Sequence, residues 1–568
     1  MTASDKAVSP PPTLSESPSG LPQRLLADGT EAKRKFWANK KRHAKKKTNR
    51  ELPVLPEGIS KHEFDQAIAD LRGQIGNENV EIVDTPLDDG WYLEHPNTHD
   101  AMHILEDDDL VASAVLYPEN TAEVQTIVLW ANKYQLPIYP ISIGRNFGYG
   151  GAAPGINGGI IVGLGKRMNK TLDIDPQDCT CLVEPGVTYF ALYEAVQARG
   201  YQHLMVDVPD LGGGSVMGNA LDRGVGYTPY GDHWAFHCGL EVVLPDGEVM
   251  RTGMGALPGN NTWQLFPYGF GPHIDGLFSQ SNLGIVTKMG VALMPHPGDH
   301  EGFIRHISIV LAANGKPRST YYDGPGQIPH EVLHEAASKE AFGDCTWVYY
   351  GMAYGPKHIR QWKLDLVHKE FMKVPGARKL DPTKLPRNDY FWVRDSVASG
   401  VPDINEINWV NWYPNGAHLA FSPVSPVRGT DALKLWDMAS SYGQKHGLDL
   451  FAAFLVGMRE MHLIVEIPYD RNDVAHREAA QKCLAYLIDE GAKQGYGEYR
   501  THVAFQDQVA NTYSWNNHAQ MHFNERIKDA LDPNGILAPG KSGVWPARFR
   551  GRKDTRMMNS GDISGVKL

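Results

Sequence analysis

The residues best suited to chemistry include an adjacent pair near the end of the chain, Tyr499 and Arg500. A tyrosine hydroxyl beside a guanidinium can bind an anion such as a phenolate or a carboxylate, because both groups donate hydrogen bonds and one carries a positive charge. The same pair on a surface turn would form an ordinary ion pair. The pattern alone favours that simpler interpretation, so other segments must decide.

A lone histidine, His418, lies between the turn at Pro414-Asn-Gly and an apolar run that continues to Phe421. Most histidines in such positions are buried and satisfied by hydrogen bonds within the core. Residue type and spacing alone therefore predict a structural role for His418.

Two glycine-rich segments could hold an anion, since glycine allows backbone N–H groups to converge on one point. The first follows a predicted strand, and a pyrophosphate is its natural ligand, although a simple turn fits the pattern as well. It does not match the GxGxxG dinucleotide motif, because no helix clearly opens from it. The candidate binding residues of the first segment are Ser142, Ile143, Gly144, Arg145, Asn146 and Gly148.

The second glycine-rich segment runs from Asp207 through Asn219 and on to His233. Its glycines and prolines force an irregular backbone, and a loop of this length in a compact domain is usually functional. We therefore expect a second segment that wraps a cofactor. Its candidate binding residues are Gly212, Gly213, Ser215, Gly218 and Asn219.

Strands and helices alternate in the N-terminal half and would position these loops. Strands are predicted at 110–116, 138–142 and 160–164, and a further strand ends at Val183. Asn120 and Thr188 are predicted to cap the two helices between them. Longer amphipathic segments at 431–442 and 474–492, with a strand at 463–467, indicate a second domain. The pattern argues for an α+β or α/β fold.

Composition and charge limit the classes of partner. The chain has 568 residues, which is too long for a single hydrophobic core. Its net charge is −11. Residues 1–50 contain 12 Lys/Arg and 4 Asp/Glu, so the remaining body is strongly acidic and a poor partner for nucleic acid. No apolar run is long enough to span a membrane, and no secretory signal is visible.

The five cysteines lack a CxxC pair or a disulfide framework, and we expect free thiols rather than metal ligands. Cys179 and Cys181 are expected to share one buried strand face. Residues 1–54 are predicted to form a disordered basic arm, with targeting or nucleic-acid binding as the alternative. We expect an intracellular, cytoplasmic protein. The peroxisome is the alternative, because the ending Val566-Lys567-Leu568 matches two of three residues of the peroxisomal Ser-Lys-Leu address.

Taken together, the four segments resemble the vanillyl-alcohol oxidase and eugenol oxidase family, which also includes the p-cresol methylhydroxylase flavoprotein. The resemblance spans about residues 55–550. Further matching stretches are 252–258, 265–272, 278–288, 457–462 and 532–546.

The resemblance implies an α+β fold with an FAD-binding domain made of two pieces, 55–295 and 505–568. A cap domain at 296–504 would cover the flavin. The two glycine-rich segments correspond to the family's FAD-binding loops. No metal is implied.

The resemblance also implies roles for individual residues. His418 matches the histidine that is joined covalently to the 8α-methyl group of FAD, which replaces the structural interpretation above. Tyr149, Tyr499 and Arg500 match the trio that binds the phenolic oxygen. Asp210 matches the carboxylate beside flavin N5, and Tyr227 matches a further active-site tyrosine.

The implied reaction is the oxidation of para-substituted phenols such as vanillyl alcohol, eugenol and 4-alkylphenols. A hydride would pass from the benzylic carbon to flavin N5 through a p-quinone methide, and O2 would be reduced to hydrogen peroxide. The alternative is a dehydrogenase that uses a protein or quinone acceptor. A small phenol and O2 are the expected partners, with no nucleic acid and no membrane.

Three positions depart from the family pattern. Met102 aligns with a histidine that assists flavin attachment, and nearby His99 and His103 are candidates to replace it. Ala420 stands where vanillyl-alcohol oxidase has a bulky aromatic residue, so we expect a wider pocket that admits a second ortho methoxy group. The stretch 258–263 is short where the octameric enzyme has an insertion, which implies a homodimer.

Overall fold

The computed structural model describes most of the chain. The basic arm up to residue 51 and the ending at 552–568, on which two sequence predictions rest, lie outside the described part. The described residues are 52–84, 98–105, 109–297, 300–301, 311–312, 315–339, 345–379, 390–457 and 459–551.

A small mixed sheet in the order β1-β2-β4-β3 forms the first layer, with β2, β4 and β3 parallel. The helices α3 (Lys61–Ile75) and α5 (Thr121–Tyr134) pack against it through a shared apolar core. The predicted Asn120 cap is present, because its side chain accepts the Glu123 N–H. The strands are β1 (Val80–Ile82), β2 (Ala114–Leu116), β3 (Ile138–Ile141) and β4 (Ile160–Gly163).

The predicted strand at 110–116 is too long, since only Ala114–Leu116 pairs with a neighbour. Leu110 has φ +53°, a left-handed conformation that cannot continue an extended strand. Its side chain is nevertheless buried. The apolar run therefore identified burial correctly and overestimated the extent of the strand.

An antiparallel sheet in the order β5-β6-β10-β8-β9 forms the second layer. Thr188 caps α6 (Tyr189–Ala198) as predicted, and Ser215 caps the short α7 (Val216–Leu221). The strands are β5 (Thr171–Asp175), β6 (Thr180–Val183), β8 (His237–Val243), β9 (Val249–Arg251) and β10 (Ile285–Ala292). The prediction for Cys179 was wrong: it lies in the turn before β6 with φ +56°, so only Cys181 of the pair is buried in a strand.

A third sheet, the cap sheet, has the order β14-β17-β15-β18, with β16 also paired to β17. The helices α12 (Gly429–His446) and α13 (Val474–Lys493) cover one face of it. The strands are β14 (Gly416–Phe421), β15 (Pro423–Pro426), β16 (Phe451–Val456), β17 (Glu460–Asp470) and β18 (Gly497–Glu498).

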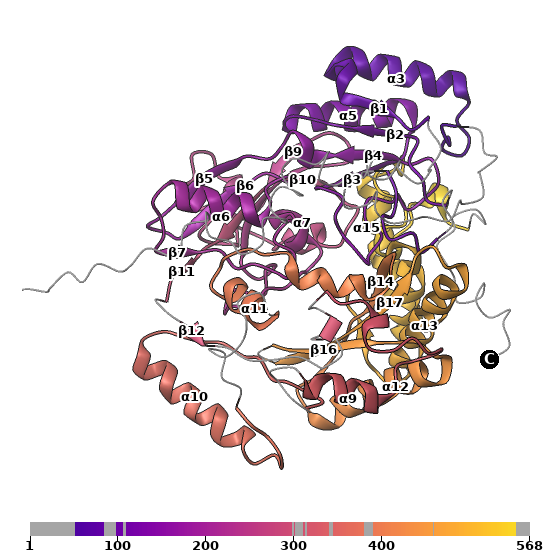
Figure 1. The fold of residues 1–568 in the computed structure, drawn as a ribbon. Coiled ribbons are helices and arrows are strands. Elements are labelled where there is room, and N and C mark those ends of the chain that lie inside the picture. The colour runs from indigo at the N-terminus through magenta and orange to yellow at the C-terminus, as the bar shows by residue number, and fades with distance from the viewer. Residues whose placement is uncertain are drawn as a thin grey trace, which may run out of the picture.

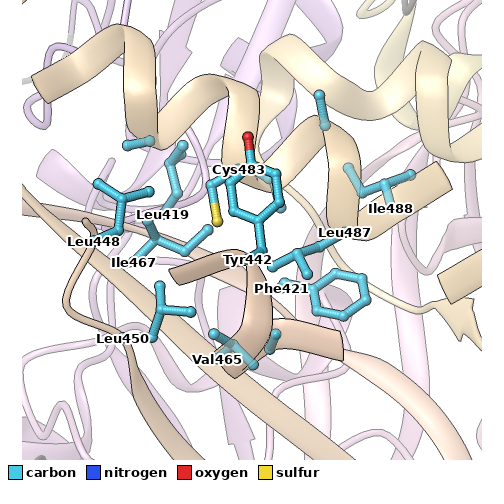
Figure 2. Packing of buried hydrophobic residues seen from close by; sticks show 14 of the residues in the cluster. Leu419, Phe421, Tyr442, Leu448, Leu450, Val465, Ile467, Cys483, Leu487 and Ile488 are labelled. Atoms are coloured by element: carbon cyan, nitrogen blue, oxygen red, sulfur yellow. The ribbon is translucent and has the colours of Figure 1, made fainter. Parts of the chain in front are cut away.

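Alternation along β14 and β17 gives the cap sheet two different faces. Leu419 and Phe421 of β14 point toward Cys483, Leu487 and Ile488 of α13, as Figure 2 shows. His418 and Ala420, which alternate with them along β14, belong to the opposite face. In β17, His462, Ile464 and Glu466 line a cavity while the intervening residues are buried in the core.

The described part of the middle region contains three helices, which are α9 (His330–Ser338), α10 (Lys357–Phe371) and α11 (Tyr390–Ala398). In Figure 1, α10 stands at the lower edge of the molecule, away from the two N-terminal sheets. Two short pairs, β7 (Leu204–Met205) with β11 (Met294–Pro295) and β12 (His300–Glu301) with β13 (Ala353–Tyr354), complete the strands described here.

The C-terminal part, which contains α14 (Gln506–Thr512) and α15 (Trp515–Leu531), returns to the first sheet. The Ile138 N–H donates to the Ile536 carbonyl at 2.8 Å, and Tyr139 donates to Pro539 at 2.7 Å. In Figure 1 the yellow end of the chain accordingly lies beside the purple N-terminal sheet. The mixed α+β class predicted from the sequence is confirmed.

Candidate functional site

A cavity of about 2110 Å³ lies between the two N-terminal sheets and the inner face of the cap sheet. Both glycine-rich segments line it, and so do residues of β14, β17 and the Tyr499–Arg500 pair. The cavity exceeds the roughly 300–1,000 Å³ of a pocket for one small molecule, so it can hold a large cofactor together with a substrate.

The first glycine-rich segment follows β3 and curves along the cavity, which Ser142, Ile143, Gly144, Arg145 and Asn146 line. Two side chains of this segment hold its backbone in place through hydrogen bonds. Arg145 donates to the Gly213 carbonyl at 3.2 Å, and Asn146 donates to Asp222 at 3.1 Å. Both contacts join the first segment to the second.

The second segment brings Ser215, Gly218 and Asn219 to the cavity. A Cβ on Gly218 would lie 2.4 Å from the Ser142 hydroxyl, so glycine is needed where the two segments meet. His233 bonds Asn219 and Asp207, at 2.6 Å each, and this buried network fixes the loop.

The remaining predicted cofactor residues lie outside the lining. Gly212 packs against Pro402 and Asp403, and Gly213 contributes only its carbonyl to Arg145. Gly148 lies directly behind His418: it has φ +78°, and a Cβ there would come within 2.5 Å of the His418 ring.

His418 lies on β14 with its ring directed to the cavity face of the cap sheet. Its Nδ1 is 2.7 Å from Glu466 Oε2 on the neighbouring strand, and Trp409 meets the ring edge to face at 4.7 Å. Its Nε2 is buried and has no hydrogen-bond partner in the part of the chain that the structure describes. A buried polar atom without a partner is costly, so a site of this kind calls for a ligand.

Tyr149, Tyr499 and Arg500 come together at one end of the cavity. The Arg500 Nη2 donates to the Tyr149 hydroxyl at 3.1 Å, and its guanidinium lies 4.2 Å from the Tyr149 ring and 5.6 Å from the Tyr499 ring. Among the described residues, no group hydrogen-bonds to the buried Tyr499 hydroxyl. The cluster thus presents a positive charge and a free hydroxyl to the same buried space.

Electrostatics keeps this cluster ready to donate. Burial raises the pKa of both Tyr149 and Tyr499, with Arg500 opposing the rise, so both hydroxyls stay protonated at neutral pH. Burial opposes the charge of Arg500, but the pKa of Arg500 is raised overall, and the hydrogen bond to Tyr149 and the nearby Asp222 carboxylate favour the charged form. One cation and two protonated hydroxyls favour an anionic oxygen as the ligand.

Asp210 forms a second polar group in the cavity, and the Tyr227 hydroxyl donates to its carboxylate. The guanidinium of Arg394 lies 3.7 Å over the Tyr227 ring and is paired with the buried Glu406 at 2.6 Å. Arg394 and Glu406 therefore hold Tyr227, and through it Asp210, in place.

The residues present fit a flavin dinucleotide. Two glycine-rich segments offer backbone along an elongated cavity, and the uncompensated Nε2 of His418 faces the same space. The described residues contain no group of three or more His, Cys, Asp or Glu that could hold a metal ion. Within the same residues, no helix has the length and apolar character needed to cross a membrane.

Sequence reasoning missed several residues of the site, notably Glu466, His462 and Arg394. Glu466 and His462 could have been found, because they alternate with Leu463, Val465 and Ile467 in one strand. Such alternation marks a strand with one polar face. Arg394 carries no comparable signal, since its contact with Tyr227 joins distant parts of the chain.

Two of the three departures from the family pattern, Met102 and Ala420, can be placed relative to the site. Met102 is buried in the core behind β14, so its side chain takes no part in the site. Ala420 is fully buried on the strand that carries His418 and is not part of the cavity lining. A wider pocket at Ala420 therefore stays a prediction.

Comparisons with known proteins agree with this geometry. Residues 112–253 match the model of an FAD binding domain, and residues 420–542 match the C-terminal domain of FAD linked oxidases. The chain is 36% identical to the 4-cresol dehydrogenase (hydroxylating) flavoprotein subunit of Pseudomonas putida, over 86% of this chain and 98% of that protein.

Two solved structures are similar over almost their whole length. One is 4-ethylphenol oxidase from Gulosibacter chungangensis in complex with isoeugenol, with 40% identity, a TM-score of 0.83, and coverage of 88% of this chain and 100% of that chain. The other is p-cresol methylhydroxylase with substrate bound, with 35% identity, a TM-score of 0.81, and coverage of 87% and 99%.

Proposed function

The chain belongs to the vanillyl-alcohol oxidase and p-cresol methylhydroxylase family of FAD-dependent oxidoreductases, and we propose that it oxidises para-substituted phenols with O2 as the electron acceptor. The proposed substrates are vanillyl alcohol, eugenol and 4-alkylphenols. The observation that carries the proposal is the convergence of Tyr149, Tyr499 and Arg500 on one buried point of the FAD cavity.

The proposed reaction begins when the trio binds the phenolic oxygen. Arg500 supplies the charge that favours ionisation of the phenol, and the two protonated hydroxyls donate to the phenolate. Holding the oxygen at this point fixes the ring in the cavity and directs its para carbon away from the cluster. Electron density pushed from the phenolate into the ring weakens the benzylic C–H bond.

Bound FAD supplies the acceptor for the hydride that leaves the benzylic carbon. The substrate is then a p-quinone methide, and Asp210 is proposed to act on it. With Tyr227 held against it, Asp210 can take the proton from a benzylic alcohol, which gives an aldehyde, or from a water that adds to an alkyl or allyl phenol.

FAD attachment is part of the same proposal. Ser142, Ile143, Gly144, Arg145 and Asn146 of the first segment, with Ser215, Gly218 and Asn219 of the second, would hold the cofactor, and His418 would form the covalent bond. A covalent link of this kind raises the potential of the flavin and so favours hydride uptake.

The test mixes the purified protein with vanillyl alcohol or 4-ethylphenol, with and without air. Flavin absorbance and hydrogen peroxide are recorded together. The proposal predicts that the flavin bleaches without air, and that peroxide accumulates with air. A flavin that never bleaches with any of several para-substituted phenols contradicts it.

A second candidate is a dehydrogenase that passes electrons to a protein or a quinone. The relative from Pseudomonas putida is named a dehydrogenase and a flavoprotein subunit, which favours this possibility. Flavin that bleaches with the phenol but stays reduced in air would identify the dehydrogenase, and a soluble quinone should then restore the oxidised spectrum.

The family resemblance also supports a proposal for the domain bounds and the assembly of the protein. We expect an intracellular homodimer whose FAD-binding domain is made of 55–295 and 505–568, with 296–504 as the cap. Light scattering on the purified chain measures the assembly directly, and a monomer or an octamer would contradict the expected dimer.

A further inference from the structure

We propose that Glu466 is the positioning residue that prepares His418 for its bond to the flavin. The inference rests on the proposed covalent attachment through His418 and adds the group that makes this histidine reactive. It is supported by the contact between the two side chains and by the surroundings of the two nitrogens of the His418 ring.

The contact determines which ring nitrogen carries the proton. Glu466 Oε2 lies 2.7 Å from His418 Nδ1, and the two side chains are only 15% and 6% exposed. An ionised carboxylate can only accept a hydrogen bond, so the proton of a neutral imidazole lies on Nδ1. The lone pair is then on Nε2, the atom that is buried without a partner.

The strand register places the two side chains together. In the antiparallel pair β14–β17, Ala420 is opposite Glu466 and His418 is opposite Pro468. His418 and Glu466 are therefore diagonal neighbours on one face, a separation that long side chains can bridge. Both line the cavity, whereas the residues on either side of them pack into the core behind the sheet.

The His418 ring has little freedom to turn away from this orientation. Gly148 lies so close to the ring that a Cβ would meet it at 2.5 Å, and Trp409 packs against it edge to face. The Glu466 hydrogen bond selects one rotation of the ring among those that fit. Partners that orient a histidine through its second nitrogen act in this way at metal sites.

The bond-forming step balances with O2 as the oxidant. A C–H bond of the 8α-methyl group and the imidazole N–H are lost, and one C–N bond forms between the methyl carbon and Nε2. The two electrons and two protons released reduce O2 to hydrogen peroxide. Glu466 is placed to take the Nδ1 proton as Nε2 becomes alkylated, so no positive charge is left on the buried ring.

The experiment follows covalent attachment in the full-length chain. Apoprotein is mixed with FAD in air, and the fraction of flavin that stays with acid-precipitated protein is measured over time, with the mass of one FAD as confirmation. Glu466→Gln should slow attachment by at least about tenfold while total flavin binding is kept. His418→Ala should bind FAD without covalent attachment.

Glu460→Gln is the matched control. Glu460 lies on the same strand six residues away and also lines the cavity, but its carboxylate accepts from the Arg459 N–H and its backbone carbonyl accepts from the Gly457 N–H. This variant should attach flavin at the wild-type rate. If Glu460→Gln slows attachment as much as Glu466→Gln does, loss of any cavity carboxylate is enough and the inference is overturned.

Other outcomes are equally decisive. Attachment at the wild-type rate in Glu466→Gln, or a covalent flavin in His418→Ala, overturns the inference. If Glu466→Gln loses flavin altogether, Glu466→Asp decides: slowed but measurable attachment supports the role, and a wild-type rate contradicts it. A wild-type protein that oxidises phenols with dissociable flavin overturns this inference and leaves the proposed function standing.

Discussion

The guanidinium of Arg500 makes contacts that a lysine cannot make together. It donates to Tyr149 at 3.1 Å while its plane lies 4.2 Å from the ring of the same tyrosine. Arginine presents a planar set of donors, whereas lysine offers a compact charge on a flexible stem. The proposed phenolate site therefore depends on the shape of the cation as well as on its charge.

We predict that Arg500→Lys lowers kcat/KM for 4-ethylphenol by about 100-fold, because loss of one preorganised donor costs this much in related settings. Steady-state kinetics measures the effect. Arg428→Lys, at an exposed arginine before α12, serves as the control and should change kcat/KM less than about twofold. If Arg500→Lys keeps the wild-type kcat/KM, the phenolate does not bind at Arg500.

Glu498 is a buried acid next to the site, and both of its carboxylate oxygens lie 2.9 Å from the Ser422 N–H. Burial raises its pKa well above the ordinary value, against the opposing influence of Ser422 and Arg500. In the unfolded chain this acid ionises near its ordinary pKa. Its contribution to stability is therefore complete below that pKa and is lost as the pH rises toward the folded-state value.

Glu498→Gln removes this ionisable group and keeps an oxygen for Ser422. The melting temperature of the variant relative to wild type should rise as the pH increases above the ordinary carboxyl pKa, and the difference should level off once the pH exceeds the raised pKa of Glu498. Thermal unfolding across this range provides the test. A variant that is destabilised equally at every pH would show that the carboxyl acts by packing alone.

The site residues differ in how far the sequence could predict them. The density of glycine in two segments predicts loops that wrap a cofactor, and Gly144 and Gly218 of these segments line the cavity. His418 was assigned to the core on residue pattern and to the flavin only by resemblance, since nothing local marks its free Nε2. The Glu466 contact depends on the register of two strands 48 residues apart, which no local pattern specifies.

At the scale of elements, α10 forms one wall of the cavity. Leu364, Val367, His368 and Phe371 recur with helical spacing and line it, and Phe371 packs on Tyr349 with ring centroids 4.4 Å apart. The other side of the helix carries Trp362, which is 64% exposed. An apolar wall at this place should contact substituents that extend from the phenol.

We predict that Phe371→Ala raises KM for a 4-alkylphenol with a long chain by about three- to tenfold, since each buried methylene contributes about 0.8 kcal/mol. KM for 4-cresol, which has no chain to bury, should be nearly unchanged. Trp362→Ala, on the opposite side of α10, is the matched control. Equal effects of both variants on both substrates would indicate a general disturbance of the helix.

Secondary structure followed from the sequence wherever caps and periodicity agreed. The helices at 431–442 and 474–492 were predicted slightly short and are confirmed as α12 and α13. The strand at 110–116 was too long, because apolar residues can be buried without pairing. The sequence did not predict which face of the cap sheet lines the cavity, because this depends on how the two N-terminal sheets pack against it.

At the scale of the whole molecule, every residue assigned to the site lies between 142 and 500. We predict that a chain lacking residues 1–51 keeps kcat/KM within about twofold of the full-length value and binds the same amount of flavin. Kinetics and flavin absorbance of the two purified chains provide the comparison. A loss of activity would assign the basic segment a role in the enzyme itself.

The return of the C-terminal part to β3 has a consequence for the newly made protein. Tyr139 donates to Pro539, 400 residues further along the chain. At about 5–20 residues per second, a ribosome needs about 20–80 s to make that interval. During this time the edge of the first sheet is exposed on the nascent chain, and for most of it Arg500 has not yet been made. Flavin attachment is therefore expected to follow release from the ribosome, and the supply of free FAD at that moment would determine how much of the protein becomes active enzyme.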